Sequence, residues 1–371
     1  MSKPIIIALT GGPCGGKSTA MEFLSRELPA YGAEVFTVPE QASALMNSGA
    51  TPETLGSYEF HRQLFQNQLQ QEETALQKTQ SSLSKCALVL CDRGLLDSRA
   101  YVEQEAFDRY AASFGFTEGK IRNRYDAVLH LVTAADGAQQ FYTLNNNAVR
   151  SESPEQARDL DEAVLSLWVG TQHLRVIDNS TDLKGKLERL LKETLAVLGI
   201  PKPLEIERKF LISYPDITLL NNMKTCRKIS IEQAYLETPC EGRFRVRRRA
   251  DGSDIKYIKT IKHKISDIKR VEIETDISEK EYYSYLAKDE YTDGIIAKDR
   301  YCFVWNAQYF ELDVYPFWAD KATMEIELLS EEQSYVLPDF INLIRDVSLE
   351  KEYRNKYLAV KYAKLFKRYG K

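Results

Sequence analysis

The first 200 residues alternate short apolar runs with longer segments in which apolar residues recur every three or four positions. Short apolar runs predict buried strands, and the three-to-four spacing predicts amphipathic helices. The predicted strands are residues 5–9, 34–38, 87–91, 127–132 and 174–177, and the helices between and after them include 19–28, 58–83 and 182–198. This alternation predicts an α/β domain with a parallel sheet covered by helices.

The pattern changes after Gly199-Ile-Pro-Lys-Pro203, where two prolines and a glycine within five residues cannot continue a helix. We therefore expect two domains, residues 1–200 and 201–371. Alternating β-branched and aromatic residues then predict strands at 205–212, 229–237, 244–249, 255–264, 271–277, 295–304, 309–315 and 324–329. Helices are expected at 279–287 and around 335–347. Eight strands with few helices predict an α+β fold with an antiparallel eight-stranded β-barrel.

Composition narrows the class of protein. A chain of 371 residues suits two cores better than one. Its six cysteines show no paired or metal-ligand spacing, which favours a reducing compartment and argues against structural zinc. The first apolar run leads directly into a glycine-rich loop, so it predicts a strand and not a signal peptide. Because no apolar stretch could span a bilayer, we expect a soluble cytoplasmic protein of undetermined oligomeric state.

Charge is unevenly distributed along the chain. The formal net charge is −4, yet the segment from Arg243 to Arg270 carries eleven Lys or Arg against three Asp. A local basic concentration in an acidic protein predicts a bound polyanion. A nucleic-acid patch with Phe244 and Tyr257 interleaved is the alternative. Acidic pairs on the neighbouring predicted strands would repel a phosphate backbone, so no stable nucleic-acid complex is expected.

The segment Gly11-Gly-Pro-Cys-Gly-Gly-Lys17-Ser18 has the G-x-x-x-x-G-K-[ST] spacing, between a predicted strand and a predicted helix. Glycines let backbone N–H groups surround phosphate oxygens, and the helix N-terminus adds positive potential. The lysine would reach the outer phosphates and the serine hydroxyl would hold Mg²⁺. The predicted nucleotide contacts are Gly11, Gly12, Gly15, Gly16, Lys17, Ser18 and Thr19.

Two further strand ends point to the same edge of the sheet. Asp92 follows a buried strand and is the expected second contact for Mg²⁺, and Glu40 follows the strand before it. Pro-Glu and Asp-Arg-Gly after these strands resemble the nucleoside and deoxynucleoside kinases. That resemblance implies that Glu40 is a base toward an acceptor hydroxyl and that Arg93 contacts phosphate. A solvated loop acid is the alternative for Glu40.

Arg150 and Arg158 bracket Ser153-Pro154-Glu155-Gln156, which has the pattern of a capped helix start. They resemble the lid arginines of small kinases and are further candidate nucleotide contacts, with ordinary surface arginines as the alternative. Residues 4–198 also resemble the AAA-type ATPase domain of bacterial ribosylnicotinamide kinases and of an animal photoreceptor channel-translocation protein. The glycine-rich loop and residues 125–136 carry this resemblance, which implies bound ATP or GTP.

Charged pairs at spacing two dominate the second half. In Glu205-Ile-Glu207-Arg-Lys209, the two carboxylates and the lysine share one face of a strand. An inward face of this kind is costly unless it binds something, and a metal bridging phosphate oxygens would compensate it. The same spacing recurs in the pairs Arg245 and Arg247, Thr260 and Lys262, Glu272 and Glu274, Lys298 and Arg300, Glu311 and Asp313, and Glu325 and Glu327.

These motifs resemble the CYTH family of triphosphate tunnel metalloenzymes over residues 203–365. The family includes inorganic, thiamine and RNA triphosphatases and some adenylyl cyclases. The resemblance implies a tunnel in which Mg²⁺ or Mn²⁺ assists attack of water on a terminal phosphoryl group. It implies catalytic roles for Glu205, Glu207, Lys209, Arg245, Arg247, Lys262 and Arg300, and metal contacts from Glu205, Glu207, Glu272, Glu274, Asp313, Glu325 and Glu327.

Two functions follow from these patterns. The first is a metal-dependent hydrolase of tripolyphosphate or a nucleoside triphosphate, joined to an ATP- or GTP-binding domain of NTPase or kinase type. The alternative is a nucleotide-switched regulatory protein that binds a phosphorylated ligand or an anionic lipid headgroup without turnover.

Overall fold

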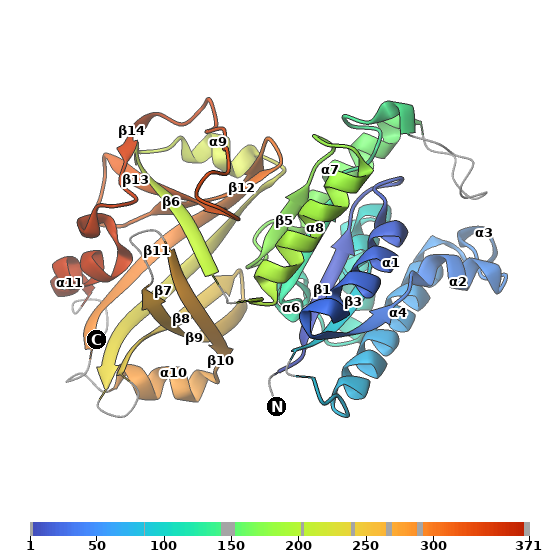
Figure 1. The fold of residues 1–371 in the computed structure, drawn as a ribbon, viewed down its shortest axis with the longest axis horizontal. Coiled ribbons are helices and arrows are strands. Elements are labelled where there is room, and N and C mark those ends of the chain that lie inside the picture. Colours follow the sequence, from blue (N-terminus) through green and yellow to red (C-terminus); the bar gives the residue numbers. More distant parts are fainter. Residues whose placement is uncertain are drawn as a thin grey trace. The chain divides into compact units, whose positions relative to one another are not determined.

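The computed structural model describes residues 3–84, 86–141, 153–201, 204–238, 242–264, 269–287 and 292–366. The chain divides into two compact units, Met1–Pro201 and Lys202–Lys371 (Figure 1). Within the described residues, no helix has the length and apolar character needed to cross a membrane.

The first unit is built on a parallel sheet with the strand order β2-β3-β1-β4-β5, counted over the described residues. Its strands are β1 (Ile5–Thr10), β2 (Ala33–Val38), β3 (Cys86–Asp92), β4 (Ala127–Leu131) and β5 (Leu174–Ile177). The predicted parallel α/β architecture is confirmed. Because β1 lies between β3 and β4, the loop after β1 has a strand end on either side of it.

Helices cover both faces of this sheet. They are α1 (Lys17–Glu27), α2 (Gln41–Asn47), α3 (Pro52–Leu55), α4 (Ser57–Thr79), α5 (Gln104–Ser113), α6 (Glu118–Arg124), α7 (Pro154–Trp168) and α8 (Leu183–Val197). Leu24 of α1 and Leu190 of α8 pack with Ile7 and Leu88 on one face. On the other face, Trp168 of α7 lies against Gly94 and in edge contact with Tyr125.

The second unit is a closed antiparallel sheet. Its neighbouring strands run β10-β9-β8-β7-β11-β12-β13-β6, and β10 pairs with β6 to close the ring. The strands are β6 (Leu204–Ser213), β7 (Cys226–Thr238), β8 (Gly242–Asp251), β9 (Asp254–Lys264), β10 (Lys269–Asp276), β11 (Thr292–Trp305), β12 (Gln308–Val314) and β13 (Lys321–Leu328). The predicted barrel of eight strands is thus confirmed, with β14 (Leu343–Asp346) added beside β6.

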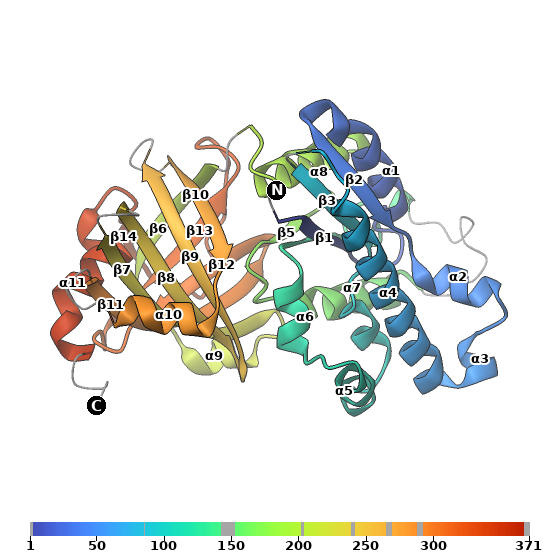
Figure 2. The same cartoon turned by 90° about the horizontal axis from the view of Figure 1, so that it is seen from below.

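The barrel carries its apolar side chains on the outside. Phe210 and Ile212 of β6 pack outward with Leu220 of α9 (Ile217–Asn222). Phe244 and Val246 of β8 pack with Tyr282 of α10 (Glu279–Leu286), the helix that crosses the outer strands in Figure 2. Since successive strand residues face opposite sides, the charged residues between these apolar ones face the interior.

One end of the barrel is filled by a helix. Leu358 and Ala359 of α11 (Asn355–Phe366) pack against Leu211 and Ile296, on the inward faces of β6 and β11, and against Tyr315, which directly follows β12. The backbone of Ala359 lies so close to Gly294 that a Cβ atom there would come within 2.7 Å of it. The helix therefore blocks this end of the interior.

The helix expected around residues 335–347 is wrong. This segment runs without helix to the strand β14, and Leu337, Phe340 and Ile341 pack on the outer apolar cluster of the barrel. Pro338 disfavours a helix there. The apolar side chains that suggested a helix are instead buried by packing on the barrel, which overrides helix propensity. The strand β14 and the helices α9 and α11 were not predicted.

Candidate functional site

The glycine-rich loop lies at the carboxyl edge of the parallel sheet, between β1 and α1. Gly11 has φ +134° and Gly16 has φ +86°, values that side chains with a Cβ atom rarely adopt. A Cβ atom on Gly11 would also come within 2.2 Å of the Leu131 carbonyl oxygen. The glycines are thus required by the close approach of the loop to the end of β4.

Lys17 folds back over this loop. Its Nζ donates to the carbonyl oxygens of Gly11 at 2.8 Å and Gly12 at 2.7 Å. Burial, together with the nearby Arg93, lowers the pKa of Lys17 to about 8. Ser18 and Thr19 are exposed in the first turn of α1, where free N–H groups and the helix dipole favour anions.

Asp92 ends β3 beside this loop, with Leu9 as its register partner on β1. The side chain is buried, and its Oδ1 has no hydrogen-bond partner among the described residues. Burial raises the pKa of Asp92, while Lys17 opposes that rise. A buried carboxylate oxygen without a partner fits a hard divalent cation or its water shell.

Glu40 and Arg93 form an ion pair at the same edge. Arg93 Nε donates to Glu40 Oε1 at 3.1 Å, and Ser43 donates to the other oxygen of Glu40 at 2.7 Å. Burial would raise the pKa of Glu40, but Arg93, Ser43 and Lys17 together outweigh it, so the pKa lies below its ordinary value. Both oxygens are occupied, so deprotonating an acceptor would require this pair to open.

A buried network fixes the backbone around Arg93, which has an unusual φ of +73°. Gln68 of α4 donates to the Arg93 carbonyl at 3.1 Å, and the Leu95 N–H donates to the Tyr125 hydroxyl at 2.8 Å. That hydroxyl donates to the buried Glu72 at 2.7 Å. The surroundings therefore hold a strained turn, as is common at functional sites.

The lid arginines are only partly described. Arg150 lies outside the described residues. Arg158 of α7 donates to the Ala135 carbonyl at 3.1 Å and pairs with Glu155. The predicted capped start of α7 is confirmed, because Ser153 and Gln156 exchange side-chain to backbone hydrogen bonds.

Sequence reasoning missed Asp161 on α7, which accepts the N–H of Gly12 and has no local motif. The same hydrogen bond connects α7 to the glycine-rich loop.

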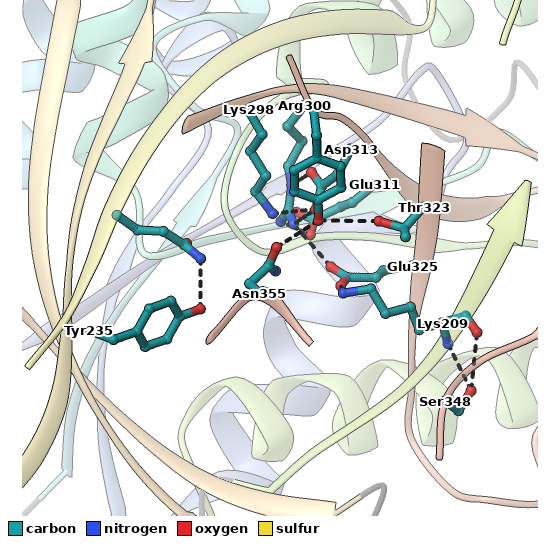
Figure 3. Close-up of polar contacts among 12 residues, drawn as sticks. Lys209, Tyr235, Lys298, Arg300, Glu311, Asp313, Thr323, Glu325, Ser348 and Asn355 are labelled. Carbon is teal, nitrogen blue, oxygen red and sulfur yellow. Dashed lines mark hydrogen bonds and ion pairs between the residues drawn. The ribbon is translucent and has the colours of Figure 1, made fainter. Parts of the chain in front are cut away.

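A compact ion cluster occupies the barrel interior (Figure 3). Arg300 Nε and Nη2 donate to the two oxygens of Asp313 at 2.7 and 2.8 Å, and Nη1 donates to Glu311. Lys298 also donates to Asp313. Burial alone would raise the pKa of Asp313, but Arg300 and Lys298 hold it below the ordinary value. Asp313 thus accepts hydrogen bonds from Lys298 and Arg300, and a metal ion at Asp313 would have to displace these side chains.

Glu325 links this cluster to β6. It accepts from Arg300 Nη2 at 3.0 Å and pairs with Lys209 Nζ at 2.7 Å. Burial opposes these cations, yet they lower the pKa of Glu325 well below its ordinary value. The Lys209 backbone N–H donates to Ser348 at 2.9 Å. Side chains from four strands are therefore locked together inside the sheet.

Two arginines of β8 face the same interior. Arg245 donates to Thr260 at 3.0 Å and to Glu274 at 3.3 Å. The Nε of Arg247 is buried, and no described residue forms a hydrogen bond or an ion pair with its guanidinium group. Burial and the neighbouring Arg245 lower the pKa of Arg247 to about 10. A half-buried arginine whose Nε has no partner among the described residues is the strongest candidate for holding an anion.

The metal contacts predicted for the barrel are partly outside the described residues, because the side chains of Glu205, Lys262 and Glu272 are not described. Glu207 and Glu327 are register partners on β6 and β13, so their side chains share a face. Across the described residues, no three His, Cys, Asp or Glu side chains are grouped closely enough to hold a metal. A metal site near Glu207 stays a prediction.

Sequence reasoning also missed two pairs of neutral polar side chains in the second unit. Gln233, wholly buried, donates to the Tyr235 hydroxyl at 2.7 Å, and Tyr315 donates to Asn355 of α11 at 2.6 Å (Figure 3). Gln233 and Tyr235 are two positions apart on β7 and so share a face, but neither belongs to a pair of charged residues. They add polar groups that carry no net charge.

Comparison with known families divides the chain at the same place as its fold. Residues 6–186 match the AAA domain and residues 203–354 match the CYTH domain. A search of curated proteins gives no significant match.

Solved structures with similarity to the chain include an inorganic triphosphatase, 29% identical over 42% of this chain and 94% of that one, with a TM-score of 0.28. Another is the PH1012 protein of Pyrococcus horikoshii, 24% identical over 33% and 77%, with a TM-score of 0.26. A third, from Hippeastrum, is described as an adenylyl cyclase with a dominant triphosphatase activity, and is 16% identical over 34% and 81% with a TM-score of 0.26.

Proposed function

We propose that this chain, in which an AAA domain is followed by a CYTH domain, is a metal-dependent hydrolase that removes a terminal phosphoryl group from a triphosphate in its barrel. The single observation that carries the proposal is Arg247, a half-buried arginine of the barrel interior whose buried Nε has no hydrogen-bond partner among the described residues. A chain of phosphates inside the barrel would supply the missing negative charge, and arginine forks suit phosphate oxygens.

The interior favours a short polyanion over a nucleic acid or a lipid. Arg245 and Arg247 lie near Glu274 and Glu311, and Glu325 pairs with Arg300, so cations and carboxylates are mixed in the barrel interior. α11 blocks one end, which excludes a ligand that must pass through. A small triphosphate can lie between the cations while carboxylates face its bound metal.

In the proposed reaction, Arg247 and Arg245 bind the phosphate oxygens and stabilise charge that develops on them. Glu207 and Glu327, with Glu205, would hold Mg²⁺ or Mn²⁺, which would polarise the phosphoryl group. Lys209 stays protonated, because Glu325 and Glu207 raise its pKa against the opposing effect of burial. Arg300 is bonded to three carboxylates and positions the cluster instead of contacting substrate directly.

For the first unit we infer binding of a nucleoside triphosphate, ATP or GTP. The glycine-rich loop, Lys17 and the buried Asp92 support this inference. Phosphorylation of an acceptor is not part of the proposal, since Glu40 is tied to Arg93 and Ser43.

The test is phosphate release by the full chain from tripolyphosphate, thiamine triphosphate, ATP and GTP, with Mg²⁺ or Mn²⁺. We expect turnover of at least one substrate, lost in Arg247→Gln and kept in Lys17→Ala. Saturable binding of tripolyphosphate without turnover would overturn hydrolysis and favour a regulatory ligand-binding barrel. Turnover that is lost in Lys17→Ala and kept in Arg247→Gln would assign the activity to the first unit.

A further inference from the structure

A second buried lysine lies beneath the glycine-rich loop. Lys186 of α8 is 4% exposed, and its Nζ donates to the Gly15 carbonyl at 3.2 Å, the Val132 carbonyl at 2.7 Å and Asn179 Oδ1 at 2.8 Å. All three acceptors are neutral. None of the described carboxylates forms an ion pair with this ammonium group.

An ammonium group in this position is costly. Removing a charge from water without a counter-charge disfavours the charged form, and burial lowers the pKa of Lys186 to about 8. Asp161 opposes that change from α7. A neutral side chain would avoid this cost but would leave the three acceptors without their donor. A negative ligand on the other side of the loop would supply the charge that these neutral acceptors do not.

The hydrogen bond to Gly15 also sets the direction of the next N–H group. In a trans peptide unit the C=O and the following N–H point in opposite directions. The Gly15–Gly16 bond is trans, since among the described residues only Ile200–Pro201 is cis. With the Gly15 carbonyl directed at Lys186, the Gly16 N–H points away from it, at the N-cap of α1. That is where a helix start binds phosphate.

Lys186 also connects separate segments of this edge. Asn179, its acceptor in the β5–α8 loop, donates to the carbonyls of Thr133 at 2.8 Å and Asp136 at 2.6 Å. One ammonium group thus joins the glycine-rich loop, the chain after β4 and the loop after β5. Its loss would release the Gly15 peptide and the Asn179 side chain together.

We propose that Lys186 is a positioning residue of the nucleotide site: it orients the Gly15–Gly16 peptide toward the polyphosphate and stabilises the phosphate charge from behind the loop. The ligand class is a nucleoside polyphosphate, and the contribution of Lys186 grows with the number of phosphates. This proposal rests on the nucleotide binding proposed for the first unit.

The experiment uses the full chain carrying Arg245→Gln and Arg247→Gln, which removes phosphate binding in the barrel. Calorimetry then measures the affinity of ATP, ADP and adenosine, and of the guanine series, for this background and for Lys186→Met added to it. We expect ATP to bind about 10 to 100 times more weakly, ADP to lose less, and adenosine to be unchanged. Lys186→Arg should recover part of the ATP affinity.

The matched control is Lys184→Met on the same helix, where the side chain is 84% exposed, and it should leave every affinity unchanged. Equal losses for ATP, ADP and adenosine would show a merely structural role and overturn the proposal. No loss for any of them would overturn it too. If Lys186→Met fails to fold, Lys186→Gln has to show the same order of losses.

Lys17→Ala in the same background separates the two proposals. If it leaves ATP and GTP binding intact, nucleotide binding by the glycine-rich loop is wrong. If it abolishes binding while Lys186→Met does not, only the role of Lys186 is wrong.

Discussion

The two units of this chain place their polar and charged groups differently: the first at the ends of its strands, the second on the inner face of its sheet. In the first unit an apolar sheet is buried between helices, and polar groups gather at the carboxyl ends of its strands. In the second unit the strands bring charged side chains inside and apolar ones outside, where α9 and α10 cover them. For binding an anion, the first unit offers largely backbone N–H groups, whereas the second offers charged side chains.

This difference changes what a mutation should do. A ligand contact at the end of a strand can be removed while the apolar core beneath it stays packed. A charge inside the barrel is held by several opposite charges, so its removal leaves them buried without compensation. Binding and stability should therefore separate in the first unit and be coupled in the second.

The largest effect is expected from Arg300→Ala in the barrel. It leaves Asp313, Glu311 and Glu325 without their shared guanidinium partner, which should cost about 3–5 kcal/mol of unfolding free energy. Hydrogen exchange of the β11–β13 amides measures this loss locally. The control is Lys228→Ala, which breaks an exposed pair with Asp299 and should cost less than about 1 kcal/mol. Similar losses of unfolding free energy in the two variants would show that the charges inside the barrel do not contribute more to stability than an exposed pair.

Next comes Lys17→Ala in the first unit. It removes charged hydrogen bonds to the nucleotide, so ATP or GTP affinity should fall roughly 10- to 100-fold per bond lost. Hydrogen exchange of β1 and β3 should stay close to that of the unaltered chain. Barrel turnover should be unaffected. A large loss of protection in β1 would show that binding and stability are coupled in this unit as well.

A smaller effect is expected from Glu207→Gln. The substitution removes one carboxylate from the pair that Glu207 and Glu327 form across β6 and β13, and so weakens binding of the divalent cation. The Mg²⁺ or Mn²⁺ concentration for half-maximal phosphate release should rise about tenfold or more. Glu332→Gln, at an exposed position of the same unit, should leave it unchanged. An unaltered metal dependence in Glu207→Gln would place the cation elsewhere.

The smallest effect concerns pH. The pKa of Lys186, lowered to about 8, means that the ammonium form predominates at pH 7 and the neutral form at pH 9.5. Asp161, Asp178 and Arg189 are the charged groups that act on it. Bound phosphate favours the protonated form, so the ratio of ATP affinities between the unaltered chain and Lys186→Met should fall toward one as pH rises through 8. A ratio that does not change between pH 7 and 9.5 would contradict this assignment.

Contiguous signals allowed much of both units to be predicted. The glycine-rich loop is a local motif, and Ser153 with Gln156 marks a helix start within four residues. Spacing two fixes which strand residues share a face, so Arg245 and Arg247, or Lys298 and Arg300, could be placed together without knowing the strand order. The roles of these residues and of the metal ligands stay predictions.

What could not be predicted depends on contacts between distant residues. Asp161 and Lys186 lie on helices far along the chain, and the residues of the glycine-rich loop that they contact are 149 and 171 positions away in sequence. The residues after Tyr335 carry apolar spacing that suits a helix, but packing on the barrel determines their extended path. No sequence pattern showed that α11 would occupy one end of the interior.

The position of α11 at one end of the barrel limits how a ligand can enter and leave. With α11 packed against Leu211, Ile296 and Tyr315, a ligand that binds at Arg245 and Arg247 has to enter and leave by the opposite end of the barrel. If the barrel hydrolyses a triphosphate as proposed, phosphate and diphosphate cannot leave by opposite ends, so they must leave one after the other. Released products should therefore compete with new substrate for the open end of the barrel. Polyphosphates much longer than the barrel interior should be shortened only from their terminal phosphates.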